Sequence, residues 1–449
     1  MLAFLEPLEE LADYQEIVRK RGKAEGILQI AGCVSSQKTH LMYALGDGFE
    51  YRVIVFSSEE KAKQAYEEYK MLEENTFLYP AKDLLFYHAD IKGAALTGKR
   101  MEVLKKLTEK KNREPVTVIT TADAFLDGLP SKEKLWESRI EIEAGAVIDF
   151  QKLQEELVHL GYERESQIEG PGQFAVRGGI LDVYPLTEEI PVRIELWGDE
   201  IDSIRSFDVE SQRSVENMEQ VVIYPATENV EKKEQAVSFS EYFPKEKSLF
   251  FFDEPVRLQE TLEAVEKEYF HSLESRKNAG MTEEADEIRV FQTKEIIEKF
   301  NTRYGIGLTT LETRCGDFKV RDVYSIQAAG VNPYNNSFEM LTQDLKKLKR
   351  QGYRVILVSG SRTRAKRLAE DLRDYDLSSF YSEDMVRTVR PGEIMVVYGC
   401  VAEGYEYPML KFMVISESDI FGKRKKKRRR KVYEGQKIQE FAELKPGDY

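Results

Sequence analysis

The residues with the clearest chemical potential stand in the stretch Gly32–Thr39. Its sequence, GCVSSQKT, follows the apolar run Gly26–Ala31, which is typical of a buried strand. In the phosphate-binding pattern G-x-x-x-x-G-K-[ST], backbone N–H groups and the lysine hold the phosphates while the hydroxyl binds Mg²⁺. Gly32, Lys38 and Thr39 occupy three of the matching positions. The stretch therefore predicts a nucleotide-binding loop or the remnant of one.

The second glycine of that pattern is replaced by Gln37. A side chain at a position that needs unusual backbone angles costs energy and crowds the phosphates. Asp253 and Glu254 end the apolar run Ser248–Asp253 and are the candidates for the acidic partner of Mg²⁺, although an Asp-Glu pair at a strand end also arises by chance. We favour an NTPase-like fold that has lost its nucleotide over one that binds it weakly.

A second set of residues lies in Pro191–Trp197, where apolar and other side chains alternate. Successive side chains of a strand point to opposite faces, so Val192, Ile194 and Leu196 face a core. Arg193 and Trp197 then share the outward face. Because Arg and Trp are enriched at binding hot spots, this strand predicts a docking surface for a protein partner.

The elements that position these residues change character along the chain. Strand-like runs alternate with helical stretches up to about residue 137, as expected for a largely parallel sheet. From about Ser138 one helix, near Phe150–Leu160, is followed by short strands, which indicates an inserted α+β module. The α/β pattern returns near Ser248–Asp253, and a further α/β domain follows from about Val323 to Gly422.

Composition sets the broad class of the protein. A chain of 449 residues with 41 % hydrophobic content is too long for one core and is not disordered. It has no apolar run of 18 residues, and its N-terminus lacks the basic start of a signal peptide. The three cysteines lie far apart and the four histidines are scattered, so we expect a reduced cytoplasmic protein without a metal site.

Charge is distributed unevenly. The formal net charge is −14, yet residues 423–431 form the nine-residue basic run KRKKKRRRK, so the rest of the chain carries −14 − 9 = −23. Such an acidic body is a poor clamp for duplex DNA, because affinity for DNA depends on neutralising phosphates. We favour a solvated linker for the basic run over a contact with DNA or polymerase.

The stretch from Gly170 to Asp208 carries a specific signature. It contains GQFAVRGG at residues 172–179, Asp182, PVR at 191–193, GDEIDSIR at 198–205 and FD at 207–208, followed by SQRS at 211–214. This signature resembles the module shared by the excision-repair protein UvrB and the transcription-repair coupling factor family, Mfd. The spoiled loop at Gly32–Thr39 and the lack of a long aromatic hairpin after Tyr79-Pro80 make Mfd the better match.

The resemblance covers nearly the whole chain and implies the N-terminal part of a bacterial Mfd. The implied fold is α/β: a degenerate RecA-like P-loop NTPase domain with an inserted α+β UvrA-binding domain, and a second α/β domain. The expected divisions are 1–137 and 227–322 for the two parts of the NTPase-like domain, 138–226 for the insert, 323–422 for the further domain, and 423–449 for a basic linker with the start of an RNA-polymerase-interacting domain.

The resemblance also implies a function. The family couples transcription to nucleotide excision repair, and this part would recruit UvrA to stalled RNA polymerase without catalysis or a cofactor of its own. ATP, Mg²⁺ and DNA translocation belong to motor domains elsewhere in the intact protein, as do the contacts with RNA polymerase and DNA and a C-terminal domain that masks the UvrA-binding face. No membrane partner is expected. The alternative is a UvrB-like ATP-dependent enzyme that processes damaged DNA.

The family's UvrA-contacting positions fall on Arg177, Arg193 and Trp197, where the third is usually another aromatic residue. Alternation along the strand does not place Arg177, because it adjoins Gly178-Gly179. The competing structural interpretations are a surface salt bridge from Arg193 to Glu195 or Glu200, and a Trp197 partly buried over the hairpin end.

Overall fold

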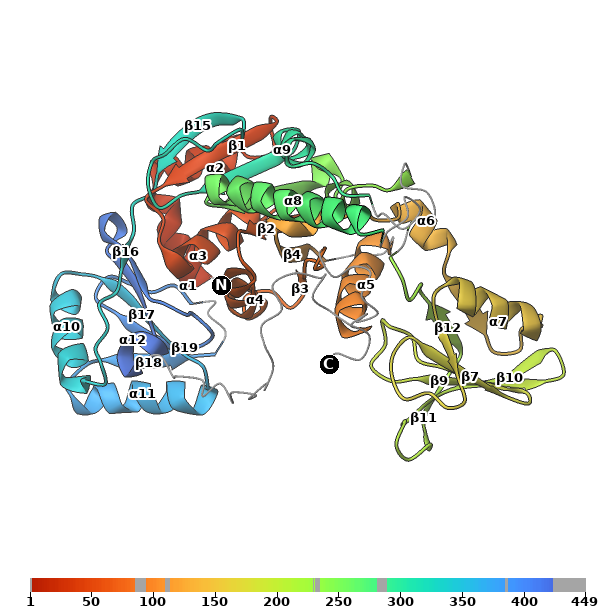
Figure 1. Ribbon diagram of the computed structural model, residues 1–449. Helices are drawn as coiled ribbons and strands as arrows, with labels where there is room; N and C mark the ends of the chain where they lie inside the picture. The colour runs from red at the N-terminus through yellow and green to blue at the C-terminus, as the bar shows by residue number, and fades with distance from the viewer. Residues whose placement is uncertain are drawn as a thin grey trace.

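The computed structural model describes residues 2–84, 94–109, 114–228, 230, 235–280, 289–383 and 387–422. Three large sheets organise this part of the chain (Figure 1). The basic run 423–431 and the rest of the segment 423–449 lie outside the described residues. Within the described residues, no helix is long and apolar enough to cross a membrane.

A seven-stranded sheet forms the centre of the molecule. All neighbouring strands of this sheet pair in parallel. Its strands, in spatial order, are β15 (Val320–Ser325), β1 (Gly26–Ala31), β14 (Tyr304–Leu308), β13 (Ser248–Asp253), β2 (Tyr51–Phe56), β4 (Val116–Thr121) and β3 (Thr76–Tyr79). The predicted α/β architecture with a parallel sheet is confirmed. The expected division between residues 322 and 323 cuts β15, which pairs with β1 in this sheet.

Helices cover both faces of the central sheet. Strands such as β4 and β13 are therefore buried along their whole length. The α-helices are α1 (Leu2–Leu5), α2 (Ala12–Lys20), α3 (Ser35–Gly46), α4 (Glu59–Lys70), α5 (Ala94–Thr108), α6 (Lys132–Glu137), α8 (Pro255–Asn278) and α9 (Thr293–Asn301). Short 3₁₀ turns are η1 (Glu6–Glu10), η2 (Ala122–Phe125), η4 (Phe239–Tyr242) and η5 (Lys245–Lys247). The long helix α8 starts at Pro255, directly after β13 and the Glu254 that follows it.

The inserted segment has a sheet of its own. Its strands, in spatial order, are β11 (Ser214–Met218), β10 (Glu200–Phe207), β9 (Val192–Trp197), β8 (Ile180–Val183), β7 (Gln173–Arg177) and β6 (Glu163–Glu165). The pairing of β6 with β7 is parallel and the other pairings are antiparallel. A two-stranded ladder of β5 (Ile140–Glu143) and β12 (Gln220–Ile223) joins the segment to the central body.

One face of the inserted sheet is its core face. Helix α7 (Phe150–His159) packs Leu153 and Leu157 into a cluster with Phe174, Leu181 and Ile194 from the strands. Asp149 caps this helix by accepting hydrogen bonds from the backbone N–H groups of Gln151 and Lys152. The helix covers the core face, whereas the opposite, outer face carries only a small buried cluster of Ile168, Ala175 and Phe207.

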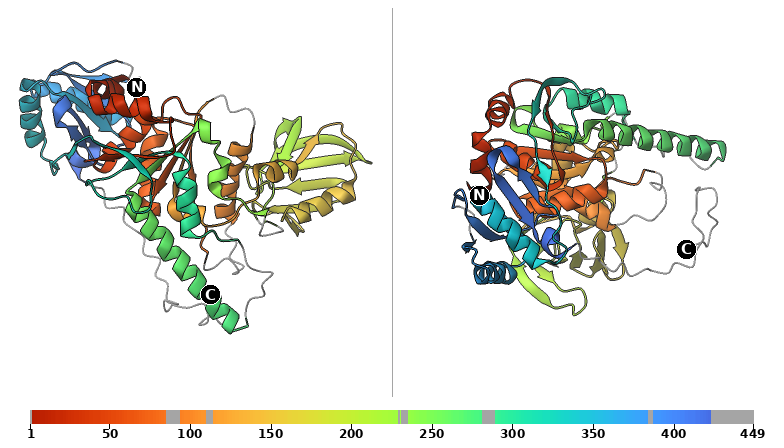
Figure 2. Two further views of the ribbon diagram at one scale, coloured as in Figure 1. Left: turned by 90° about the horizontal axis from the view of Figure 1, so that it is seen from above. Right: turned by 90° about the vertical axis from the view of Figure 1, so that its left-hand side faces the viewer.

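The third sheet belongs to the last described segment. Its strands, in spatial order, are β16 (Ala329–Gly330), β20 (Tyr405–Tyr407), β21 (Phe412–Ser416), β17 (Arg354–Ser359), β19 (Ile394–Tyr398) and β18 (Ser379–Ser382). The helical elements are α10 (Phe338–Arg350), α11 (Arg362–Asp374), η7 (Pro408–Leu410) and α12 (Glu417–Phe421). This sheet and the inserted sheet lie at opposite ends of the molecule (Figure 2).

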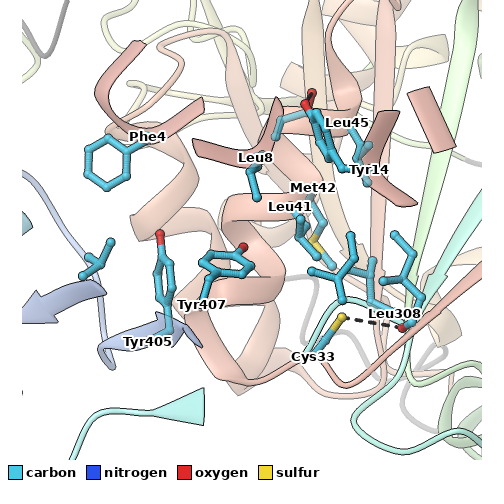
Figure 3. Close-up of a cluster of buried hydrophobic side chains, with 14 of the residues drawn as sticks. Phe4, Leu8, Tyr14, Cys33, Leu41, Met42, Leu45, Leu308, Tyr405 and Tyr407 are labelled. Atoms are coloured by element: carbon cyan, nitrogen blue, oxygen red, sulfur yellow. Dashed lines mark hydrogen bonds between the residues drawn. The ribbon is translucent and has the colours of Figure 1, made fainter. Parts of the chain in front are cut away.

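The third sheet shares a hydrophobic core with the central body. Tyr405 and Tyr407 are buried beside Phe4 and Leu41 (Figure 3). His40, from α3, hydrogen-bonds through its two ring nitrogens to the Tyr407 hydroxyl (2.9 Å) and to the Phe4 carbonyl (2.9 Å). The last α/β segment is therefore fixed to the helix that follows the phosphate-loop-like stretch.

Candidate functional site

The outer face of the inserted sheet carries the predicted docking residues. Val192 and Ile194 are buried, whereas the Trp197 side chain at the end of β9 is 84 % exposed. The alternation predicted for this strand is confirmed, and a Trp197 partly buried over the hairpin end is wrong. A tryptophan left this open in a folded domain contributes nothing to the core beneath it, so its large apolar surface remains for a partner.

Strand register places Arg177 on the same face. Arg177 lies opposite Ile180 in the β7–β8 pair, and Ile180 lies opposite Glu195 in the β8–β9 pair. Directly opposite residues of neighbouring strands point to one face, so Arg177 joins Arg193 and Trp197 there. Its guanidinium is exposed and donates from Nη2 to the Ser166 carbonyl at 3.1 Å. The structure thus brings the three predicted residues to a single face.

Arg193 lies in a cradle formed by Asp182, Gln212 and Phe207 and not in open solvent. Its Nε and Nη2 atoms donate to the two oxygens of Asp182 at 2.7 and 2.9 Å, and Nη2 also donates to Gln212 Oε1 at 2.9 Å. The guanidinium lies over the Phe207 ring, 4.4 Å from its centroid. Bidentate pairing and stacking hold the planar group in one orientation. No described residue accepts a hydrogen bond from the remaining nitrogen, Nη1.

The partner of Arg193 differs from both predicted alternatives. Glu195 pairs instead with Arg205 and accepts a hydrogen bond from Ser203. Asp182 lies directly opposite Arg193 in the β8–β9 register, which the spacing within one strand could not reveal. The hydrogen bonds from Arg193 to Asp182 are the largest influence on its pKa and raise it above the usual value, although burial opposes them.

Gln212 is the second residue of the cradle that sequence reasoning missed. It has φ +57°, an uncommon left-handed conformation for a residue other than glycine, and its Nε2 donates to the Val209 carbonyl at 2.8 Å. Asp208 holds the same turn by accepting hydrogen bonds from the Ser211 backbone N–H and hydroxyl at 2.8 and 2.6 Å. The sequence feature that could have indicated Gln212 is the polar stretch SQRS at 211–214. The polar side chains of such a turn often hydrogen-bond to groups on the adjacent strands.

The phosphate-loop-like stretch folds differently from a phosphate-binding loop. Helix α3 begins at Ser35, so the turn after β1 is reduced to Gly32–Val34. Gly32 has φ +86°, whereas Gln37 lies within the helix. The Gln37 Oε1 atom accepts a hydrogen bond from the Val34 N–H at 3.1 Å. A side-chain amide therefore occupies a backbone donor at the helix N-terminus, where a phosphate would bind.

Lys38 is tied to the acidic end of β13. Its Nζ atom is 2.6 Å from Asp253 Oδ1 and 2.6 Å from Glu254 Oε1, and its side chain is only 9 % exposed. Burial disfavours the charged amine, but the two carboxylates outweigh it and raise the pKa of Lys38. Glu254 Oε1 is held further by the backbone N–H and hydroxyl of Thr310, at 2.9 and 2.7 Å. The predicted phosphate ligand and the predicted Mg²⁺ partners therefore neutralise one another.

Thr39 is likewise engaged by protein. Its side chain is buried beside Glu68, which accepts hydrogen bonds from the Ser36 hydroxyl at 2.8 Å and from the Ala402 N–H at 3.0 Å. Burial raises the pKa of the Glu68 carboxyl. The loop before β20 thus closes over the start of α3. These contacts, with the shortened turn and the Gln37 amide, do not fit a bound nucleoside triphosphate with Mg²⁺.

The comparisons with known proteins agree with the geometry of the inserted sheet. Residues 140–229 match the UvrB interaction domain family. The chain is 25 % identical to a transcription-repair-coupling factor of Bacillus subtilis (strain 168), in an alignment covering 98 % of this chain and 42 % of that protein. It is 26 % identical to the transcription-repair-coupling factor of Staphylococcus aureus (strain bovine RF122 / ET3-1), over 84 % of this chain and 36 % of that protein.

These findings identify the class and the relatives of the chain. It is an α/β protein that carries a UvrB interaction domain. It is related over nearly its whole length to the transcription-repair-coupling factors, and it spans about two fifths of the length of the curated relatives it matches.

Proposed function

We propose that this chain acts in transcription-coupled nucleotide excision repair, and that its UvrB interaction domain recruits UvrA. The observation that carries the proposal is an outer sheet face with an 84 %-exposed Trp197, set in a domain that matches the UvrB interaction domain family. The exposed Arg177 and the cradled Arg193 lie on the same face of the sheet as this aromatic residue. We assign partner binding to Arg177, Arg193 and Trp197.

The three residues suit different parts of one interaction. Trp197 offers a large apolar surface with few rotatable bonds, which is the usual anchor of an interface. Arg193 is already oriented by Asp182 and Gln212, so binding through Nη1 would order little side-chain freedom. Arg177 is an accessible cation that favours an acidic group on the partner.

We further propose that the NTPase-like part, residues 1–137 and 227–322, is a degenerate RecA-like domain that binds no nucleotide. The mutual ion pairing of Lys38 with Asp253 and Glu254 supports this proposal. Residues 138–226 are the UvrA-binding insert, 323–422 a further α/β domain, and 423–449 a basic linker leading to an RNA-polymerase-interacting domain. We assign ATP-driven DNA translocation, the contacts with RNA polymerase and DNA, and the masking of the UvrA face to other domains of the intact protein.

The test is a calorimetric titration of the chain with purified UvrA from the same organism. Trp197→Ala and Arg193→Ala are each expected to weaken binding by about 2 kcal/mol or more, as hot-spot truncations do. Phe270→Ala, which removes an exposed aromatic side chain from α8, is the matched control and is expected to bind like wild type. Equal UvrA affinity of wild type and of the variant that combines Arg193→Ala with Trp197→Ala would overturn the proposal.

A separate titration with Mg·ATP addresses the alternative of a UvrB-like enzyme. Wild type is expected to give no binding heat at millimolar nucleotide, because Lys38 and the helix N-terminus are engaged within the protein. Micromolar Mg·ATP affinity that is lost in Lys38→Ala would favour the enzyme.

A further inference from the structure

The short segment 144–148, which precedes α7, extends the inserted sheet sideways along the start of β10, near the tip of the β9–β10 hairpin. The Ile201 N–H donates to the Ala146 carbonyl at 2.9 Å, and the Ile148 N–H donates to the Asp199 carbonyl at 2.8 Å. These two bonds flank an antiparallel bridge between Val147 and Glu200. The segment therefore lies beside the start of β10 as a further, very short strand.

This bridge places Val147 on the outer face. Glu200 lies opposite Val147 on one side and opposite Trp197 on the other. Directly opposite residues share a face, so Val147 and Trp197 point the same way on either side of Glu200. Two strand spacings separate their backbones, about 10 Å, which one partner surface spans easily.

Val147 is unusual in its own segment because it stays open to solvent. Its side chain is 75 % exposed, whereas its neighbours Ala146 and Ile148 pack against the core cluster beneath the sheet. The Val147 side chain thus stabilises the domain little. Its backbone is held by the hydrogen bonds that the neighbouring Ala146 and Ile148 make to β10 and the turn before it. Two exposed apolar side chains are therefore held on one face, on either side of Glu200, where one partner surface can contact both.

We propose that Val147 is a further contact residue for UvrA, next to Trp197. This inference rests on the proposed function of the outer face. Glu200 lies between the two apolar side chains, and the exposed Asp199 follows Trp197 by two residues. The complementary surface on UvrA is therefore apolar with basic side chains around it.

The experiment measures UvrA affinity by titration with the full chain and Val147→Asp. We expect about tenfold weaker binding, because a carboxylate would be desolvated against an apolar surface. Val147→Ala keeps the backbone pairing and removes only two methyl groups, so it is expected to weaken binding about threefold. Thermal unfolding of both variants should match wild type, since the side chain is exposed.

The matched control is Val158→Asp. Val158 is an exposed valine on α7, which covers the core face, so it belongs to the same domain but to its far side. UvrA affinity within twofold of wild type is expected for this variant. In a double-mutant cycle, Val147→Asp and Trp197→Ala should combine less than additively, because both residues contact one partner surface.

The outcomes separate the inference from the function it rests on. If wild type binds UvrA and Trp197→Ala weakens binding, but Val147→Asp stays within twofold of wild type, the inference fails and the proposed function stands. If wild type does not bind UvrA, both fail. If Val147→Asp instead abolishes self-association of the chain in sedimentation and leaves UvrA affinity unchanged, the patch is a contact between copies and the inference is overturned.

Discussion

The carboxyl end of the central sheet and the outer face of the inserted sheet both display cations, but their surroundings differ. At the first, Lys38 is 9 % exposed and bound to two carboxylates, and Thr39 is buried beside Glu68. At the second, Trp197 is 84 % exposed and the Arg177 guanidinium is accessible. A matching motif is therefore weaker evidence for a binding site than the hydrogen bonding and exposure of its polar groups. Polar groups whose hydrogen bonds and charges are paired within the protein stabilise the fold. Polar groups that are fixed in orientation but exposed to solvent can bind a partner.

The largest expected effect of a substitution is at Lys38, whose charge is neutralised within the protein. Lys38→Ala leaves Asp253 and Glu254 without their buried counter-charge, so we expect a loss of about 3 kcal/mol or more in the free energy of unfolding. Urea unfolding followed by circular dichroism measures this loss. Lys61→Ala is the control, because Lys61 also pairs with Asp253 but is 42 % exposed, and a change of about 1 kcal/mol or less is expected. Unchanged stability in Lys38→Ala would mean that this lysine is available to a ligand.

The contact between α3 and the third sheet gives a smaller effect that depends on pH. Burial lowers the pKa of His40 from 6.5 to about 4. The unfolded state therefore binds more protons between these two values, so the stabilisation present above pH 6.5 is lost as the pH falls toward 4. We expect His40 to cost about 2 kcal/mol of unfolding free energy between pH 7 and pH 5.

The contribution of His40 is isolated by comparing wild type with His40→Gln. Glu68 has a raised pKa and acts in the opposite direction, but it is common to both proteins and cancels in the difference. Wild type should lose stability more steeply than the variant from pH 7 to pH 5 in urea unfolding. Parallel pH profiles would show that His40 is not sealed in this interface.

Arg193 combines features of both regions, because its guanidinium is held in one orientation by neighbouring side chains but lies on the outer face of the inserted sheet. Arg193→Lys keeps the charge and loses both the fork that pairs with Asp182 and the stacking on Phe207. We expect about tenfold weaker UvrA binding, which corresponds to about 1.4 kcal/mol. Arg177→Lys should stay within about threefold, because Arg177 is not held in a comparable cradle. Equal losses in the two variants would show that charge alone matters at Arg193.

Strand alternation and short-range pattern predicted much of this molecule. The period of two in residues 191–197 was enough to separate the buried Val192 and Ile194 from the exposed Trp197. The apolar runs Gly26–Ala31 and Ser248–Asp253 became strands β1 and β13 of the parallel sheet. These features depend on local sequence alone, which is why they could be read before the fold was known.

The remaining features depend on pairing between distant segments. Asp182 meets Arg193 only through the β8–β9 register, and Val147 joins the outer face only through its bridge to Glu200. Gln37 lies within α3 and accepts a hydrogen bond from the Val34 N–H, a contact that the motif pattern did not reveal. No spacing rule reports such contacts.

The central claim is that the open face of the inserted sheet, and not the sealed end of the central sheet, is the binding site of this chain. Isothermal titration of UvrA into wild type, Trp197→Ala and Lys38→Met tests it most directly, below the unfolding temperature of each protein. We expect wild type and Lys38→Met to bind with similar affinity, and binding by Trp197→Ala to be weakened about thirtyfold or more, which corresponds to the expected 2 kcal/mol. Undiminished affinity in Trp197→Ala would contradict the claim.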